Sequence, residues 1–281
     1  MVYLKLLRPK QWIKNLLVFV PIFFAQDFFG KDKIWQASLS FIVFCFTAST
    51  VYIMNDIFDR KIDQNHPKKQ HRPIASGKVT VKVAVMMVIA SFLLSVILSY
   101  VFIPLITPIL LVYLFLNLVY SWRIKHVVIF DVLFISIFYL LRILAGGLAT
   151  NTPISSWLIL CVFFASLLVI IGKRIGEQSQ LHKREVLQYY SSDFLKQLLS
   201  ISSSLVVVSY GLYSILGFHL GDHPNLVVYS IFFVVLGVFR YLYLIYSSAE
   251  VEFPEKLIFS DKVVFGSFVG WILYMFFVIY L

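Results

Sequence analysis

The sequence has 281 residues, of which 60% are hydrophobic, 17% are aromatic and only 14% are charged. An ordinary soluble domain is about 45 to 50% apolar and about 25% charged, so this composition excludes such a domain and favours a membrane protein. Lysine and arginine together outnumber aspartate and glutamate by ten. In so apolar a chain, this excess indicates basic loops at an anionic membrane face and argues against nucleic-acid binding.

Nine apolar segments have about the 20 residues that a membrane-spanning helix needs. In chain order they fall near residues 14–30, 34–54, 80–103, 104–120, 127–149, 154–172, 198–219, 225–247 and 262–281. The third and fourth are the least clearly separated, because only Pro104 and Pro108 interrupt the run between them. The sequence therefore predicts an all-α fold, a bundle of nine transmembrane helices in which residues 1–281 form a single integral membrane domain.

Basic residues gather on one side of this bundle. Of the 24 lysines and arginines, all but Lys31, Lys33, Arg142 and Arg240 lie in the N-terminal segment or in even-numbered connections. The positive-inside rule then predicts a cytoplasmic N-terminus and an external C-terminus, in a bacterial-type inner or plasma membrane. The two long polar connections, near 55–79 and 172–197, are both cytoplasmic on this basis, and long ordered connections tend to be functional. We expect the active site there.

The connection after the second helix carries aspartates at helical spacing. Asp56, Asp59 and Asp63 stand at i, i+3 and i+7, with Asn55 four residues before Asp59, so they line one face if the helix continues past the membrane boundary. Such carboxylates repel one another unless a cation joins them, and Mg²⁺ takes one or two carboxylates together with phosphate oxygens and water. Arg72 and its neighbouring lysines can hold the same phosphates. The segment predicts a magnesium–diphosphate site; a solvated charged loop is the alternative.

This acidic segment, Asn-Asp-x-x-Asp-x-x-x-Asp, resembles the motif of the UbiA superfamily of intramembrane prenyltransferases. Further motifs are Arg8-Pro9-x-Gln11-Trp12-x-Lys14-Asn15, His66-Pro67-x-Lys69-x-x-Arg72-Pro73-Ile74-Ala75-x-Gly77, Tyr120-Ser121 with Lys125, Arg142, and Ala145-Gly146-Gly147. Over residues 3 to about 195 they are similar to the branch typified by decaprenyl-phosphate phosphoribosyltransferase. The resemblance implies Mg²⁺-dependent transfer of 5-phosphoribose from phosphoribosyl diphosphate to a polyprenyl phosphate, with release of diphosphate.

The connection after the sixth helix departs from the superfamily pattern. Where aromatic prenyltransferases of the superfamily carry a second Asp-x-x-x-Asp motif, this chain has Lys173, Arg174 and Glu177. Two cations and one acid suit an additional phosphate better than a second metal ion, and both the donor and the acceptor of the implied reaction carry one. The other interpretation is that the two cations only anchor a helix end at the membrane surface.

The resemblance also implies roles for individual residues. We expect catalytic roles for Asp56, Asp59, Arg72 and Lys125, and metal binding by Asn55, Asp56, Asp59 and Asp63. Substrate-binding residues are expected to be Lys14, Asn55, Asp63, Lys69, Tyr120, Asp131, Lys173, Arg174 and Glu177. Asp131 lies about 6 Å into its helix, where it either contacts ribose or metal or pairs with a buried cation. Arg142 lies deeper and is expected to form a structural pair, beside a Gly146-Gly147 step that allows close helix packing.

Two other functions remain open on the sequence alone. The same acidic motif fits a UbiA-type enzyme that moves a prenyl group from a prenyl diphosphate to an aromatic or other small acceptor, although the second aspartate motif is missing. A non-catalytic lipid-binding or transport protein would explain the helices and the buried charges, but not two cytoplasmic motifs of opposite character, one acidic and one basic. The expected partners are a polyprenyl phosphate, phosphoribosyl diphosphate and membrane lipids; self-association and isoprenoid length are left open.

Overall fold

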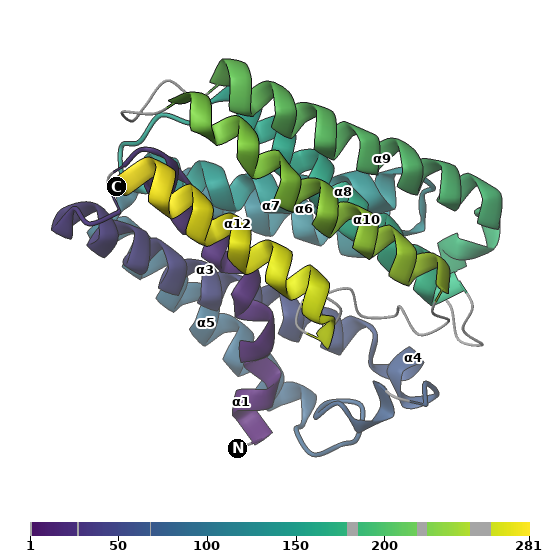
Figure 1. Cartoon of the computed structure of the whole chain (residues 1–281). Coiled ribbons are helices and arrows are strands. Elements are labelled where there is room, and N and C mark those ends of the chain that lie inside the picture. The colour runs from purple at the N-terminus through teal and green to yellow at the C-terminus, as the bar shows by residue number, and fades with distance from the viewer. Residues whose placement is uncertain (1, 27, 68, 179–184, 218–223, 248–259) are drawn as a thin grey trace. The chain divides into compact units, whose positions relative to one another are not determined.

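The computed structural model describes residues 2–26, 28–67, 69–178, 185–217, 224–247 and 260–281, and within them every regular element is a helix (Figure 1). Two compact units account for the chain. One comprises Met1–Arg123 and Leu141–Pro153, and the other comprises Ile124–Leu140 and Ile154–Leu281. We describe each unit by itself, and the assignment of the whole chain to a single domain stays a prediction.

Eight helical segments in the described residues are long and apolar enough to cross a membrane. They contain α3 (Lys31–Phe58), α5 (Val81–Phe102), α6 (Thr107–Trp122), α7 (Phe130–Ala149), α8 (Ser156–Gln178), α9 (Ser192–Leu212), α10 (Ile231–Ser247) and α12 (Lys262–Tyr280). The all-α membrane fold is therefore confirmed, with eight long helices that correspond to the second to ninth predicted segments. The predicted break at Pro104 is also present, because α5 ends at Phe102 and a 3-10 turn, Pro104–Ile106, precedes α6.

The first predicted segment, near 14–30, has a different form. Residues Pro9–Phe19 form a 3-10 helix (η1), followed by the short α2 (Val20–Phe24) and preceded by α1 (Val2–Leu7). Proline at position 21 has no N–H to donate to the Leu17 carbonyl, which accepts instead from Val20, three residues on. Since a 3-10 helix rises about 2.0 Å per residue, η1 and α2 together cover about 30 Å, close to the thickness of the hydrocarbon core.

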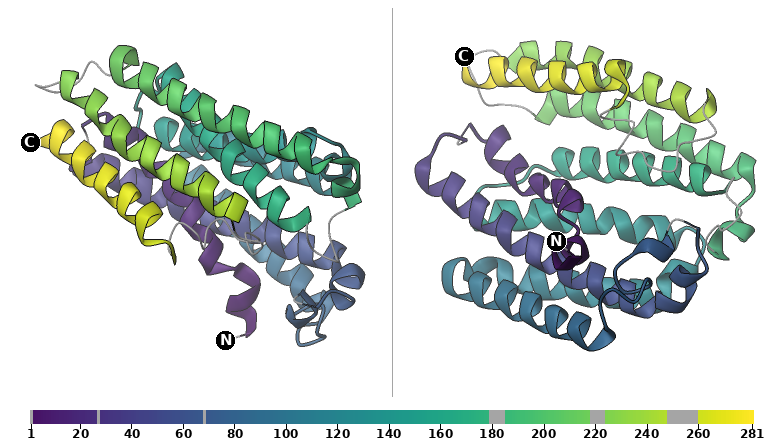
Figure 2. Two further views of the ribbon diagram at one scale, coloured as in Figure 1. Left: turned by 45° about the vertical axis from the view of Figure 1, so that its right-hand side comes forward. Right: turned by 90° about the horizontal axis from the view of Figure 1, so that it is seen from below.

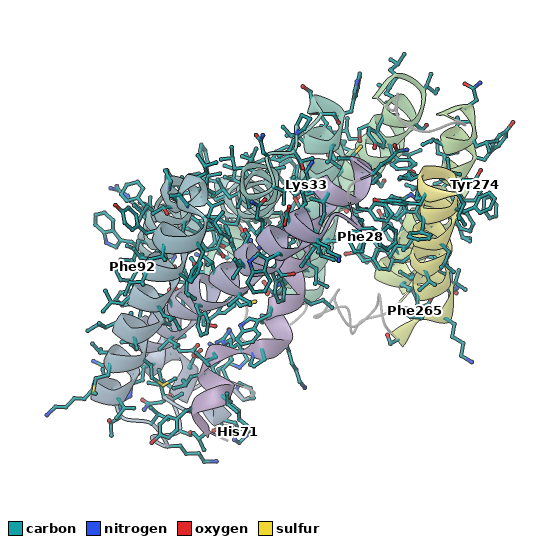
Figure 3. All side chains as sticks on the ribbon, turned by 90° about the vertical axis from the view of Figure 1, so that its left-hand side faces the viewer. Phe28, Lys33, His71, Phe92, Phe265 and Tyr274 are labelled. Atoms are coloured by element: carbon teal, nitrogen blue, oxygen red, sulfur yellow. The ribbon has the colours of Figure 1, made fainter. Side chains whose placement is uncertain are left out.

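In the first unit, α5 and α6 pack against α3, and η1 crosses α3 (Figure 1). The face of α5 toward α3 carries small serines, and Thr50 and Ser91 share a buried hydrogen bond of 2.8 Å. Small side chains let two helices approach closely within a membrane. The other face of α5 is apolar and exposed, as expected for lipid contact. Phe92 of α5, labelled in Figure 3, is 36% exposed.

In the second unit, α8 packs against α9, and α10 packs against α12 (Figure 2). Gly172 marks a tight contact: a Cβ there would stand 2.2 Å from the Tyr241 hydroxyl oxygen. Two of the helices begin at side-chain caps. Ser191 accepts a hydrogen bond from Phe194 N–H at the start of α9, and Asp261 accepts from Val264 N–H at the start of α12.

Helix ends differ from the predicted ones where polar residues continue a helix beyond its apolar run. Helix α8 extends to Gln178 although its apolar run ends near residue 172, because Glu177 pairs with Arg174 and Lys173 one turn earlier. The residues predicted as the start of a loop are therefore the last turns of a helix. Residues 179–184, in the middle of that predicted connection, lie outside the described residues.

Candidate functional site

Two aspartates of the acidic segment meet at one arginine. Arg72 Nη1 donates to Asp56 Oδ1 at 3.0 Å and to Asp63 Oδ2 at 2.7 Å. Arg8 Nη2 donates to the same Asp56 oxygen. Both aspartates are buried, each 2% exposed, whereas the arginines are partly accessible. We call Arg8, Asp56, Asp63 and Arg72 the acidic cluster; it consists of two carboxylates neutralised by two guanidinium groups.

Local helical structure places the aspartates. Helix α3 ends at Phe58, Asp59 caps it, and α4 (Arg60–Gln64) continues the helical path, with Asp63 N–H bonded to the Asp59 carbonyl at 2.8 Å. The helical path thus continues past the apolar run, with a break at Asp59, and this is the condition under which the spacing places the aspartates together. Asp56 on the last turn of α3 and Asp63 on α4 lie two turns apart, which brings both carboxylates within reach of Arg72.

The loop after α4 turns back to deliver Arg72. Ile74 is 1% exposed and packs in an apolar cluster with Leu6 and Ile53, which fixes the loop against α3. Gly77 has φ +74°, in the left-handed region that glycine adopts without strain, and the chain turns there toward α5. The Pro73-Ile74-Ala75-x-Gly77 motif therefore serves to hold the arginine before it at the two aspartates.

Arg8 enters the cluster from the chain's N-terminal segment. It caps η1 with a φ of 51°, and its guanidinium carbon lies 5.3 Å from the ring centroid of Tyr52 on α3. Burial lowers the pKa of Arg8, and the Asp56 carboxylate acts in the opposite direction by favouring its charged form. The sequence motif included Arg8, but we did not predict it as a site residue; the adjacent Pro9, which fixes the start of η1, was the available signal.

The acidic cluster has the donor set of a magnesium–phosphate site. Because Asp56 and Asp63 bond to the same nitrogen atom, their two carboxylate oxygens converge on the space of a single cation. Mg²⁺ in phosphate sites is usually held by one or two carboxylates, with water and substrate oxygens completing its shell. No cluster of three or more Asp, Glu, His or Cys side chains in the described residues is arranged to hold a metal ion. The pair fits such a phosphate-dependent site.

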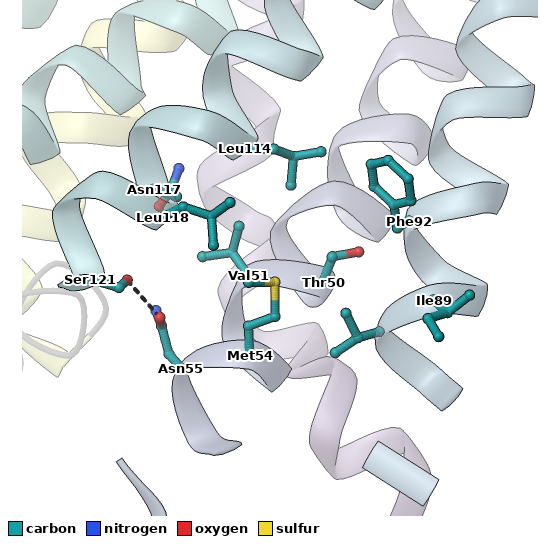
Figure 4. Close-up of a pocket in the computed structure, with 11 residues that line it drawn as sticks. Thr50, Val51, Met54, Asn55, Ile89, Phe92, Leu114, Asn117, Leu118 and Ser121 are labelled. Atoms are coloured by element: carbon teal, nitrogen blue, oxygen red, sulfur yellow. Dashed lines mark hydrogen bonds between the residues drawn. The ribbon is translucent and has the colours of Figure 1, made fainter. Parts of the chain in front are cut away.

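Asn55 lies beside the acidic cluster, at one end of a cavity of about 160 Å³. The Ser121 hydroxyl donates to Asn55 Oδ1 at 2.7 Å (Figure 4), which links the last turns of α3 and α6. The rest of the cavity is lined mainly by apolar side chains of α3, α5 and α6, among them Val51, Met54 and Leu114. Asn55 is thus positioned by a residue that the Tyr120-Ser121 motif contributes.

A second cluster forms in the other unit around a fully buried arginine. Arg174 on α8 is 1% exposed; its Nε donates to Asp131 Oδ2 at 2.9 Å and its Nη1 to Glu177 Oε2 at 2.7 Å. The Tyr190 hydroxyl donates to the other Asp131 oxygen at 2.7 Å. Lys173 Nζ lies 3.9 Å from Glu177 Oε1, at the accessible edge. We call Asp131, Arg174, Glu177 and Tyr190 the Arg174 cluster.

Asp131 is 0% exposed and pairs with a buried cation, which is one of the two interpretations given to it; contact with substrate or metal stays a prediction. Arg174 directs two of its donor atoms to carboxylates. Lys173, 32% exposed at its side chain, is the more accessible of the two adjacent cations. Tyr190 was not predicted, because a single tyrosine after a polar connection carries no sequence signal for a bond to a residue 59 positions earlier.

The other predicted site residues occupy separate elements and are all partly exposed. They are Lys14 on η1, Asp59 at the end of α3, Lys69 on the 3-10 turn Lys69–His71, Tyr120 on α6 and Lys125 on the 3-10 turn Ile124–His126. Their positions leave the predicted roles as proposals.

Arg142 forms the structural pair predicted for it. It is 4% exposed; its Nε donates to Asn15 Oδ1 at 2.8 Å and its Nη2 to the Tyr113 hydroxyl at 2.9 Å. One turn along α7, a Cβ on Gly146 would stand 2.1 Å from the Val18 carbonyl oxygen, so η1 lies against the backbone of α7. Close packing at this glycine is confirmed.

Comparisons with known proteins agree with this fold and its motifs. A model of the UbiA prenyltransferase family matches residues 16–259. A Corynebacterium glutamicum protein named decaprenyl-phosphate phosphoribosyltransferase is 32% identical over 283 residues, 96% of this chain and 84% of that protein. A Mycobacterium tuberculosis protein of the same name is 33% identical over 219 residues, 75% of this chain and 72% of that protein.

The fold is also similar to that of a UbiA homolog from Archaeoglobus fulgidus, whose structure was solved with DMAPP and Mg²⁺. The TM-score is 0.77 at 19% sequence identity, with 99% of each chain covered. At this identity the likeness concerns the fold alone.

Proposed function

This chain belongs to the UbiA prenyltransferase family, and we propose that it transfers 5-phosphoribose from phosphoribosyl diphosphate to a polyprenyl phosphate. The observation that carries the proposal is the match, over 96% of this chain, to a protein named decaprenyl-phosphate phosphoribosyltransferase. The replacement of the second aspartate motif by Lys173, Arg174 and Glu177 supports it, because this removes a metal-binding acid pair and places the partly exposed cation of Lys173 where an additional phosphate can be held.

The acidic cluster binds the diphosphate of the donor. Asp56 and Asp63, with Asn55 and Asp59 beside them, would hold Mg²⁺, which neutralises charge on the leaving diphosphate. A magnesium–diphosphate group brings both cationic and anionic charge to a cluster that is already paired. In such a complex Asp56 and Asp63 would hold the metal and Arg72 would hold diphosphate oxygens, so that no charge would be left buried alone.

Arg8 has the same exchange of partners available, and Lys125 adds positive charge as the diphosphate leaves. Lys14, Lys69 and Tyr120 contact the substrates in this proposal. In the second unit, Lys173 contacts a further phosphate. The buried Arg174 acts through Asp131 and Glu177 by holding them in place.

The reaction needs no general base from the protein. A phosphate oxygen of the polyprenyl phosphate attacks the anomeric carbon of the ribose; the new bond is carbon–oxygen, and the bond from that carbon to diphosphate breaks. The attacking oxygen is already an anion, so no proton has to be removed. The products are a polyprenylphosphoryl-5-phosphoribose and diphosphate.

On the proposed orientation, both polar connections and the N-terminus face the cytoplasm of a bacterial-type plasma membrane.

Prenyl transfer to a small acceptor is the second candidate, because a structurally similar UbiA homolog was solved with the prenyl diphosphate DMAPP. Purified protein with Mg²⁺ should be given each donor, with and without a polyprenyl monophosphate. The proposal expects diphosphate release from phosphoribosyl diphosphate only when the lipid is present. Consumption of a prenyl diphosphate, with phosphoribosyl diphosphate inert, would favour the second candidate.

Lys173→Gln tests the phosphate contact in the second unit. A charge-assisted contact to phosphate is worth about 1.5 to 3 kcal/mol, so KM for one of the two substrates should rise about tenfold or more. Lys196→Gln on the exposed face of α9 removes the same charge from the same unit and serves as the matched control. Equal KM values in the two variants would contradict the proposed contact.

A further inference from the structure

We infer that Tyr190 is a positioning residue. Its hydroxyl bonds to both Ile129 and Asp131, holds the turn that they form before α7, and so fixes the segment that carries Lys125. The inference rests on the proposed function only for the role of Lys125. All of its contacts lie within the second unit, and Tyr190 itself touches no substrate in this account.

The Tyr190 hydroxyl joins two residues of one short turn. It accepts a hydrogen bond from Ile129 N–H at 2.6 Å and donates one to Asp131 Oδ1 at 2.7 Å. Tyr190 is 3% exposed and Asp131 is 0% exposed, so water does not replace either bond freely. The only polar atom of the tyrosine side chain is therefore used both as acceptor and as donor, at the residues that start α7.

The turn held in this way is a strained one. Ile129 has φ +72°, in the left-handed region that a β-branched residue rarely adopts. Such a conformation persists where surrounding contacts hold it. The Ile129 carbonyl accepts from the N–H groups of Val132 and Leu133 in the first turn of α7, and its own N–H donates to Tyr190, the tertiary contact of this turn. Ile129 is 42% exposed, so its side chain is not enclosed by the protein and the backbone bond to Tyr190 is available to hold the turn.

Tyr190 is itself fixed by the last turn of α8. The Gln178 side-chain amide donates to the Tyr190 carbonyl oxygen at 2.7 Å, and Asp131 also accepts from Arg174 of the same helix. Burial, followed by its bond to Asp131, raises the pKa of Tyr190 well above its ordinary value, so the hydroxyl stays a neutral donor. The turn before α7 is thereby locked to the end of α8, which carries Lys173.

Lys125 lies four residues before Ile129, on the 3-10 turn Ile124–His126 that begins this segment. A second contact ties the same turn to the Tyr190 region: His126 Nδ1 lies 3.2 Å from Glu185 Oε2, but both side chains are exposed. Exposed pairs contribute little, so of these two contacts the buried Tyr190 hydroxyl holds the Lys125 segment more firmly.

Tyr190→Phe removes the hydroxyl alone, and the exposed neighbour in Tyr189→Phe is the matched control. Amide hydrogen exchange over residues 124–131 should become faster by about tenfold or more in Tyr190→Phe, with α9 unchanged, since both bonds of the hydroxyl, to Ile129 N–H and to Asp131, are lost. For the transferase reaction, kcat should fall about tenfold, with KM for either substrate changed by less than about threefold. Tyr189→Phe should match the wild type in both.

Ile129→Gly supplies an independent test, because glycine adopts a positive φ without strain. In that background Tyr190→Phe should reduce kcat by less than about threefold, a coupling expected of two residues in one contact. The inference is overturned if the effects of Ile129→Gly and Tyr190→Phe on kcat are additive. It is also overturned if hydrogen exchange and kcat in Tyr190→Phe equal those in Tyr189→Phe. If the wild type uses a prenyl diphosphate instead, the proposed function fails, while exchange and rates with that donor still test Tyr190.

Discussion

Replacing Arg72 by methionine separates two roles of this residue: its pairing with two aspartates, which the structure shows, and its proposed contact with the leaving diphosphate. Arg72 Nη1 donates to Asp56 and Asp63, whose side chains are each 3% exposed. Each charge-assisted bond is worth about 1.5 to 3 kcal/mol. The Arg72 side chain is 29% exposed, and Arg8 still pairs with Asp56 when Arg72 is replaced. We therefore expect the interaction free energy lost with the Arg72 guanidinium to be about 2 to 3 kcal/mol, which is less than the sum of two bonds.

The two measurable consequences of Arg72→Met have opposite signs. Without this cation, the two carboxylates attract a divalent ion more strongly, so substrate-free protein should bind Mn²⁺ about tenfold or more tightly, measured by electron paramagnetic resonance titration. Turnover should fall by about 30- to 150-fold, which corresponds to about 2 to 3 kcal/mol of lost charge neutralisation on the leaving diphosphate.

Arg60→Met, at the exposed first residue of α4, is the control with the same change of side chain. It should leave both the Mn²⁺ affinity and turnover within about threefold of the wild type, as an exposed charge contributes little. If the metal and the Arg72 guanidinium bind the same two carboxylates, Arg72→Met cannot leave Mn²⁺ affinity unchanged. Unchanged affinity, or a fall of affinity together with turnover, would refute this shared site.

Three further predictions concern packing, topology and pH. Gly146→Ala should lower the melting temperature, because its Cβ would stand 2.1 Å from backbone oxygen of η1, whereas Gly266→Ala has no atom within 4 Å and should not. In a cysteine-free background, an impermeant thiol reagent should label a cysteine at Gln64 only from the cytoplasmic side and one at Asn151 only from outside; the reverse pattern overturns the orientation. Bonding to its arginine partner lowers the pKa of Asp261 to about 2 from 3.8. The carboxylate therefore stabilises α12 above about pH 4, and this stabilisation is lost as pH falls through about 2, so acid unfolding followed by circular dichroism should be shallower in Asp261→Asn.

Apolar runs predicted the eight long helices of the described residues, because a membrane-spanning helix needs about 20 predominantly apolar residues in sequence whatever its tertiary contacts are. Helix ends were predicted less well where charged residues pair along a helix, as Arg174 and Glu177 do at the end of α8. The form of the first segment depends on Pro21 and on contacts such as that between Asn15 and Arg142, 127 positions apart in sequence. Hydropathy carries no record of such pairs.

For the site, spacing placed Asp56 and Asp63 on one helical path, and the structure brings them together. Which cation meets which carboxylate could not be predicted, since Arg8 is 48 residues from Asp56 and arrives through the fold of η1. Asp131 has two interpretations, and the structure shows the ion pair with Arg174, while contact with substrate stays a prediction. Long-range pairing of charges follows from tertiary packing, so the sequence yields the residue types of a site before it yields their partners.

The lipid product tests the proposed reaction most directly. Purified protein with Mg²⁺, phosphoribosyl diphosphate and a polyprenyl monophosphate should yield a lipid whose mass has increased by one phosphorylated pentose, so that it carries ribose and two phosphates. Mass spectrometry of the extracted lipid, with ¹³C-labelled ribose in the donor, measures this without relying on rate. An unmodified polyprenyl phosphate, together with an isoprenoid attached to a small acceptor when a prenyl diphosphate is supplied, would contradict the account.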